Sequence, residues 1–177
     1  ELARAVLALP HHPSLVGVFV NTPAKEVNRI AGYCSLDLVQ LSGTETRQYC
    51  QQIERPLIKV VHVSAGKTYH DIVNEIEAGS RLLAGQDIIY LLDTKISGIY
   101  GGTGQTFDWQ LAQQVSERFP VMVAGGLTPA NVGKLVSKIH PWGVDVSSGV
   151  ETNGQKNIAK IKAFIHAIRN TETERNI

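Results

Sequence analysis

The stretch DIIYLLDTKISGIYGGTGQTFDW, residues 87–109, indicates how this chain folds. It opens with a short apolar run, Ile88–Leu92, whose length and composition suit a strand buried on both faces. The run ends on Asp93, and a loop with three glycines in residues 101–104 precedes a helical pattern. α/β proteins place their chemistry at the carboxyl ends of buried strands, so Asp93 is a candidate catalytic residue. The alternative is an aspartate that only caps its own loop.

The rest of the chain repeats this alternation of strand and helix. We expect strands at Val16–Val20, Asp37–Leu41, Leu57–Val63, Ile88–Leu92, Val121–Ala124 and Gly143–Val146. We expect helices over residues 1–9, then at Pro23–Ile30, Glu45–Ile53, Tyr69–Leu83, Asp108–Glu117, Pro129–Ile139 and Asn157–Arg169. Thr128 is the expected N-cap of the helix that begins at Pro129. Regular alternation favours a parallel sheet, because every parallel pair of strands needs a crossover connection.

Two α/β architectures compete for this pattern, a doubly wound open sheet and a (β/α)8 barrel. The chain lacks the G-x-G-x-x-G motif that a dinucleotide-binding doubly wound fold carries after its first strand. A barrel needs eight units in about 200–250 residues, and this chain of 177 residues holds six. Residues 1–9 already read as the helix of a preceding unit. We therefore expect a TIM barrel truncated at its N-terminus to six units, with residues 1–177 as one partial domain.

Composition excludes several classes of function. A formal net charge of +1 and scattered basic residues give no reason to expect nucleic acid or an anionic membrane as a partner. Two cysteines are a poor basis for a disulfide framework, and no apolar run reaches the roughly 18 residues of a membrane span. The six histidines show no metal-ligand spacing, so no metal site is expected. These features predict a soluble cytoplasmic protein.

The last two expected strands end in loops that suit a phosphate group. Gly125 and Gly126 follow one strand, and Ser148 and Gly149 follow the next. Glycines let the backbone approach an anion closely, and amide groups at the start of a short helix point towards it. In barrels the loops after strands seven and eight frequently hold a substrate phosphate. We interpret the two loops as a phosphate site; ordinary tight turns are the alternative.

Five motifs together resemble the phosphoribosylanthranilate isomerase family of tryptophan biosynthesis. They are DLVQLSGTE at 37–45, LLDT at 91–94, GGTGQTFDW at 101–109, AGGLTP at 124–129 and VDVSSGVE at 144–151. The resemblance runs in register from Val16 to the final helix. It implies a cofactor-free Amadori rearrangement of N-(5-phosphoribosyl)anthranilate to 1-(2-carboxyphenylamino)-1-deoxyribulose 5-phosphate.

The resemblance also assigns residues. Asp93 matches the general acid that opens the furanose ring, and Asp145 matches a second active-site aspartate. A carboxylic acid serves near neutral pH only where burial or a neighbouring charge favours its protonated form. The further residues that the resemblance implies for substrate or phosphate binding are Gly102, Gly104, Gly125, Gly126, Ser148, Gly149, Gln40 and Ser42.

The chain departs from the family pattern in two places. Ser42 stands where the family usually has histidine in Gln-Leu-His-Gly, and a serine hydroxyl can still donate a hydrogen bond there. The Lys-Ile-Cys-Gly segment with the family's general base, and an arginine expected to hold the anthranilate carboxylate, have no counterpart here. Cys34 and Cys50 instead read as small buried or half-buried residues.

Two hypotheses follow. In the first, the chain is the bulk of such an isomerase, acting on a small phosphorylated substrate as a monomer or homodimer. In the second, it is a catalytically incomplete fragment that binds phosphate, or associates through edges left by missing strands. Another phosphate-binding barrel enzyme, such as a ribulose-phosphate epimerase, is a weaker alternative because it would require a metal-ligand set.

Overall fold

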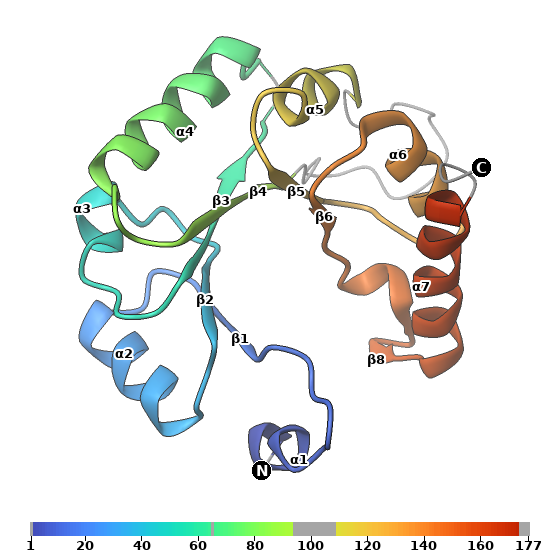
Figure 1. Cartoon of the computed structure of the whole chain (residues 1–177), viewed down its shortest axis with the longest axis horizontal. Coiled ribbons are helices and arrows are strands. Elements are labelled where there is room, and N and C mark those ends of the chain that lie inside the picture. Colours follow the sequence, from blue (N-terminus) through green and yellow to red (C-terminus); the bar gives the residue numbers. More distant parts are fainter. Residues whose placement is uncertain (1, 65, 94–108, 174–177) are drawn as a thin grey trace. The chain divides into compact units, whose positions relative to one another are not determined.

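The computed structural model describes residues 2–64, 66–93 and 109–173. In this part of the chain six strands form one sheet in sequence order, with helices between them (Figure 1). The strands of the sheet are β1 (Val16–Phe19), β2 (Leu38–Leu41), β3 (Leu57–His62), β4 (Ile88–Asp93), β5 (Val121–Ala124) and β6 (Gly143–Val144). The helices are α1 (Leu2–Leu7), α2 (Ala24–Tyr33), α3 (Arg47–Cys50), α4 (Tyr69–Leu82), α5 (Trp109–Ser116), α6 (Val132–Ile139) and α7 (Ile158–Thr173). A 3₁₀ turn η1 (Ser148–Val150) and a hairpin of β7 (Glu151–Thr152) and β8 (Gln155–Lys156) complete the described elements.

The strand pairing confirms a parallel α/β fold. β1 pairs with β2 so that Phe19 lies opposite Leu41, and β2 pairs with β3 in the same direction. β5 and β6 are likewise parallel, with Val123 opposite Val144. Because consecutive strands are neighbours and run in the same direction, the chain must cross over between them.

The described chain divides into two compact units, and the divisions fall inside β3, α4 and β4. The first unit comprises residues 1–60 and 74–90, and the second comprises 61–73 and 91–177. Each unit has its own buried apolar residues.

The core of the first unit lies between its strands and α2. The helix follows Pro23, whose carbonyl oxygen accepts hydrogen bonds from the amides of Glu26 and Val27. This agrees with the proline-led start that the sequence predicts. Its inner face packs on the apolar side chains of β1 and β2. The fully enclosed members of this cluster include Val27, Ala31, Val39, Leu41 and Leu57.

The core of the second unit lies between β5 and the helices that follow it. α5 packs on α6, and α6 packs on α7. Each helix presents apolar residues at helical spacing to this core. The buried side chains are Ala112, Val115, Val121, Val123, Val132, Leu135, Val136, Ile139 and Phe164.

The predicted starts of two helices are wrong, and a side-chain hydrogen bond accounts for each. α3 begins at Arg47 rather than at Glu45, because the hydroxyl of Thr46 caps it by accepting from the amide of Tyr49 at 3.2 Å. α6 begins at Val132 rather than at Pro129. The side chain of Asn131 turns back to accept from the amide of Thr128 at 2.8 Å, so the intervening residues form a turn. Three predicted ends also differ, since α3 ends at Cys50 rather than Ile53, α2 continues to Tyr33 and α7 to Thr173.

Candidate active site

Asp93 is the last residue of β4 and remains accessible from the strand end. Its side chain is 20% exposed, and its Oδ2 lies 3.9 Å from Nδ1 of His62, the last residue of β3. The carbonyl oxygen of Asp93 accepts from the amide of Val63 at 2.9 Å, which ties the ends of the two strands together. The sequence places Asp93 at a strand end, as observed, but gives no reason to single out His62.

Asp145 follows β6 directly and lies within electrostatic reach of Asp93. Its amide donates to the carbonyl oxygen of Val123 at 3.0 Å, which fixes the backbone against β5. Burial raises the pKa of Asp145, and the negative charge of Asp93 raises it further. A hydrogen bond from the amide of Val146 and the charge of Lys156 oppose this shift. The second unit therefore brings together both aspartates that the sequence singles out.

The loop after β5 contains two glycines in a left-handed conformation. Gly125 has φ 101° and Gly126 has φ 63°, and other residues rarely adopt such angles. Asn131 braces the loop, since its side-chain amide donates to the carbonyl oxygen of Gly126 at 3.1 Å. This hydrogen bond fixes the conformation of the loop, and Gly126 remains exposed to solvent.

The turn after β6 lies against this loop. A β-carbon added to Gly149 would overlap the carbonyl oxygen of Leu127, so the two backbones are in direct contact at these residues. Within the part of the chain that the structure describes, the amides of Gly126, Ser148 and Gly149 donate no hydrogen bond to another residue. Two adjacent turns with unused donors are the arrangement that an anion-binding site requires.

A hairpin that the sequence reading missed supports the second turn. β7 and β8 are antiparallel and are joined by Asn153 (φ 52°) and Gly154 (φ 75°). Two central residues with positive φ define the type I′ turn for which Asn-Gly is the strongest short sequence signal, so the hairpin was predictable. The hairpin carries Lys156, whose Nζ donates to the carbonyl oxygen of Ser147 at 3.0 Å.

In the first unit, Gln40 and Ser42 lie together at the carboxyl end of β2. The side-chain amide of Gln40 donates to the hydroxyl of Ser42 at 3.2 Å, and the Ser42 amide donates to the carbonyl oxygen of Phe19. The following residue Gly43 is held by the carboxylate of Glu45, which also binds Lys59 Nζ at 2.9 Å.

The remaining predicted site residues, Gly102 and Gly104, belong to residues 94–108 and lie outside the described part of the chain. Cys34 is half-buried and Cys50 is buried, as predicted. Burial raises the pKa of the Cys50 thiol, which works against any role for it as a thiolate.

Comparison with known proteins places this site in a family. A sequence model of N-(5'phosphoribosyl)anthranilate (PRA) isomerase matches residues 3–167, which is almost the whole chain. The chain belongs to the PRA isomerase family. An N-(5'-phosphoribosyl)anthranilate isomerase of Dehalococcoides mccartyi is 49% identical over 175 residues, a match that covers 99% of this chain and 80% of the relative.

Solved PRA isomerase structures share the fold. The enzyme from Thermotoga maritima is 37% identical and superposes with a TM-score of 0.75, over 95% of this chain and 78% of that one. A PRA isomerase in complex with reduced 1-(O-carboxyphenylamino)-1-deoxyribulose 5-phosphate is 34% identical, with a TM-score of 0.72, over 95% of this chain and 77% of that one. The parallel α/β arrangement observed here is therefore the PRA isomerase fold over the matched length.

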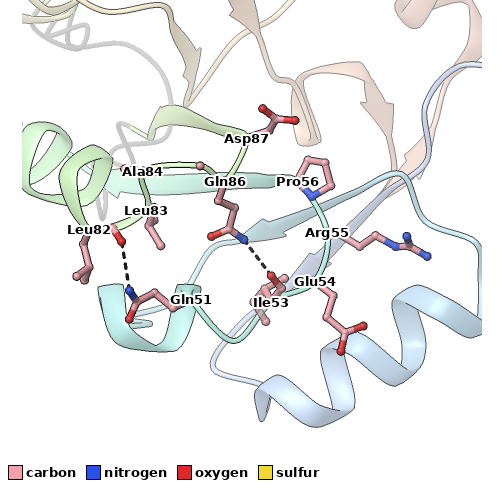
Figure 2. A pocket seen from close by; sticks show the side chains of 11 residues that line it. Gln51, Ile53, Glu54, Arg55, Pro56, Leu82, Leu83, Ala84, Gln86 and Asp87 are labelled. Atoms are coloured by element: carbon pink, nitrogen blue, oxygen red, sulfur yellow. Dashed lines mark hydrogen bonds between the residues drawn. The ribbon is translucent and has the colours of Figure 1, made fainter.

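One hollow of the first unit lies away from the carboxyl ends of its strands. Figure 2 shows that it is lined by residues leading into β3 and β4, including Arg55 and Asp87. Its volume is about 500 Å³. Gln86 donates to the carbonyl oxygen of Ile53 at 2.9 Å, and Gln51 donates to that of Leu82 at 3.2 Å. Barrel-type PRA isomerases carry their chemistry at the opposite strand ends, so we assign these contacts to stability.

Two features are absent from the residues that the structure describes. No group of three or more histidine, cysteine, aspartate or glutamate side chains among them could hold a metal ion. No helix among them is both long enough and apolar enough to span a bilayer.

Proposed function

We infer that this chain carries out the isomerisation of N-(5-phosphoribosyl)anthranilate to 1-(2-carboxyphenylamino)-1-deoxyribulose 5-phosphate, a step of tryptophan biosynthesis. Membership of the PRA isomerase family supports the reaction. The observation that carries the residue assignment is the electrostatic coupling of Asp145 to Asp93, beside two turns with unused amide donors.

The reaction begins with acid catalysis, which we assign to Asp93. Its carboxylic acid donates a proton to the furanose ring oxygen, the C1–O bond breaks, and the nitrogen lone pair forms an iminium ion at C1. Burial raises the pKa of the neighbouring Asp145, and the negative charge of Asp93 adds to this shift, which supports placing the two carboxyl groups in one site. Proton transfer of this kind typically contributes about 10²–10⁴-fold to the rate.

A base then removes the proton from C2, which gives the enol amine that tautomerises to the ketone product. Asp145 contacts the sugar hydroxyls or the reacting amine during these steps. The resemblance places the base on a cysteine in a segment that this chain does not contain, so we assign the base to a preceding segment of the protein. No net oxidant or co-reactant is needed, because the proton leaves C2 while C1 gains one.

The substrate phosphate is bound by the backbone of two turns. The amides at Gly125, Gly126, Ser148 and Gly149 supply donors without a positively charged side chain at the contact itself. By the motif matches, Gln40, Ser42, Gly102 and Gly104 are further residues that bind the substrate. These assignments rest on the motif matches and on the local geometry of each turn.

We propose further that residues 1–177 form one partial domain, six units of an eight-unit barrel whose first two strands lie in a preceding segment. The chain spans 80% of its relative from Dehalococcoides mccartyi, which leaves room for such a segment. The finished enzyme is a monomer or a homodimer in the cytoplasm. A second candidate role, association through an open edge, is favoured by exposed valines at β1, an edge strand of the sheet. Val16 and Val18 on β1 are 39% and 61% exposed, and Val20, just after it, is 59% exposed.

An isomerase assay that follows loss of substrate fluorescence tests the function. We expect full activity from the protein with its preceding segment, and loss of activity on replacing Asp93. Intact-mass measurement and gel filtration of residues 1–177 distinguish the enzyme from a self-associating fragment. Full activity from a verified 177-residue monomer would overturn the assignment of the base to a preceding segment.

A further inference from the structure

Lys156 is the one basic side chain that the described structure joins by hydrogen bonds to the Ser147–Gly149 turn. Its Nζ donates to both the carbonyl oxygen and the hydroxyl of Ser147, at 3.0 and 3.2 Å. The same ammonium group forms an ion pair with Glu151 Oε1 at 2.6 Å. Lys156 thus ties Ser147, the first residue of the turn, to Glu151, the residue that follows η1.

The hairpin gives this clamp a fixed origin. The positive φ angles of Asn153 and Gly154 reverse the chain directly after β7, which returns Lys156 to a position opposite Glu151 in the pairing of β7 with β8. Asn157, the residue after Lys156, donates its amide to the carbonyl oxygen of Val150 at 2.9 Å. The backbone of Lys156 is therefore fixed by the strand pairing and by the hydrogen bond of the residue that follows it.

The ion pair contributes little to folding. The side chain of Lys156 is 53% exposed, and exposed pairs of this kind are worth about 0–1 kcal/mol. The role of Lys156 is better sought in the turn that its side chain contacts. This turn has unused amides and lies against the loop after β5.

We propose that Lys156 is a positioning residue that fixes the Ser147–Gly149 turn in the shape that binds the substrate phosphate. This inference rests on the phosphate site proposed above. The charge of Lys156 also acts on Asp145, lowering its pKa, so the same side chain links the phosphate turn to the second aspartate. Loss of the clamp releases the turn without removing any group that reacts.

The test compares Lys156→Met, Lys156→Arg and Glu151→Gln in the full-length protein. We expect Lys156→Met to raise both KM and the inhibition constant of inorganic phosphate by about tenfold, the loss expected for one or two hydrogen bonds. We expect kcat to stay within about threefold, because the chemical step is untouched. Lys156→Arg keeps the donors and recovers most of the affinity, and Glu151→Gln shows a smaller change of the same kind.

Lys160 supplies the matched control. It lies on α7 and donates to the carbonyl oxygen of Glu151, and in the described part of the chain no hydrogen bond joins its side chain to Ser147. Lys160→Met should leave both constants within about twofold of wild type. If KM and the inhibition constant rose equally in Lys160→Met and Lys156→Met, the effect would come from the loss of one positive charge and not from the turn. Unchanged phosphate inhibition in a folded Lys156→Met protein overturns the proposal.

Direct titration with inorganic phosphate separates this proposal from the proposed reaction. If the wild-type protein binds phosphate but does not turn over the substrate, the reaction fails, and Lys156 is still judged by the change in phosphate affinity. If the wild-type protein does not bind phosphate, the phosphate site and the role of Lys156 fail together. If Lys156→Met does not fold, Glu151→Gln and Lys156→Arg decide the outcome.

Discussion

Gly149 lies against Leu127 so closely that a β-carbon at position 149 would overlap the carbonyl oxygen of Leu127. No side chain separates the turn after β6 from the loop after β5. The obstacle is main chain on both sides, so it cannot be relieved by changing a rotamer. Glycine at 149 is therefore required for the two turns of the proposed phosphate site to meet.

Replacing Gly149 by alanine should damage stability and phosphate binding together. Forcing the two backbones apart should cost about 1–3 kcal/mol of the free energy of unfolding, as overpacking does. The displaced amides should raise KM by about tenfold or more. Chemical denaturation and steady-state kinetics measure the two effects.

Gly32 provides the control. It is exposed near the end of α2, and an added β-carbon there would meet no atom within 4 Å. Gly32→Ala should stabilise the protein by about 0.5–1 kcal/mol, since alanine favours helix more than glycine does. A Gly149→Ala protein as stable and as active as wild type would contradict the close contact.

Asp93→Asn tests the general acid. Asparagine keeps the size of the side chain but has no acidic proton, so kcat should fall by about 10²–10⁴-fold with KM changed only a few-fold. Asp87→Asn is the matched control, because Asp87 is an exposed aspartate immediately before β4, whereas Asp93 ends that strand. A fall in kcat of the same size in both variants would show that the substitution acts through the strand rather than through catalysis.

The raised pKa of Asp145 predicts a pH dependence of stability. Its ordinary value is 3.8, and burial raises it in the folded protein. A group that is harder to ionise when folded contributes no penalty below its unfolded pKa and destabilises the protein as pH rises through its folded pKa. Asp145→Asn removes the ionisation. The free energy of unfolding of the variant, relative to that of wild type, should therefore increase from pH 4 upward and become constant above the folded pKa of Asp145. Denaturation curves between pH 4 and 8 check the sign, and a gain towards acid would contradict it.

The sequence was most informative where function depends on strand ends. Asp93 was predicted because it directly follows a short apolar run, whereas Asp145 was assigned by the family resemblance, and the glycine pairs mark turns whatever their neighbours do. The start of α6 was predicted wrongly because the side chain of Asn131 accepts from the amide of Thr128. This hydrogen bond favours a turn over helix at residues 129–131, and neither helix propensity nor Pro129 reveals it. The role of Lys156 depends on which residues a hairpin brings opposite each other, and the Asn-Gly signal for that hairpin was overlooked.

Lys59 and Glu45 show the limit of sequence reading more clearly. They are 14 residues apart, and nothing in the apolar strand β3 marks Lys59 as the partner of a carboxylate in the loop that follows β2. In the structure the Glu45 side chain is 1% exposed and the Lys59 side chain 13%. Burial works to raise the pKa of Glu45, but hydrogen bonds from the Asn21 amide and from Lys59 outweigh it, so the pKa is lowered.

This buried pair should be the most costly ion pair to break in the first unit. Lys59→Met leaves Glu45 buried with only amide donors, and we expect a loss of about 3 kcal/mol in the free energy of unfolding. The double variant Lys59→Met/Glu45→Leu should recover part of that loss, because it buries no unpaired charge. The exposed pair Arg29–Glu26, with side chains 65% and 43% exposed, serves as the control, and Arg29→Met should change stability by no more than about 0.5 kcal/mol. Equal losses at the two pairs, measured by urea denaturation at pH 7, would mean that the Glu45 carboxylate is not enclosed as the structure describes.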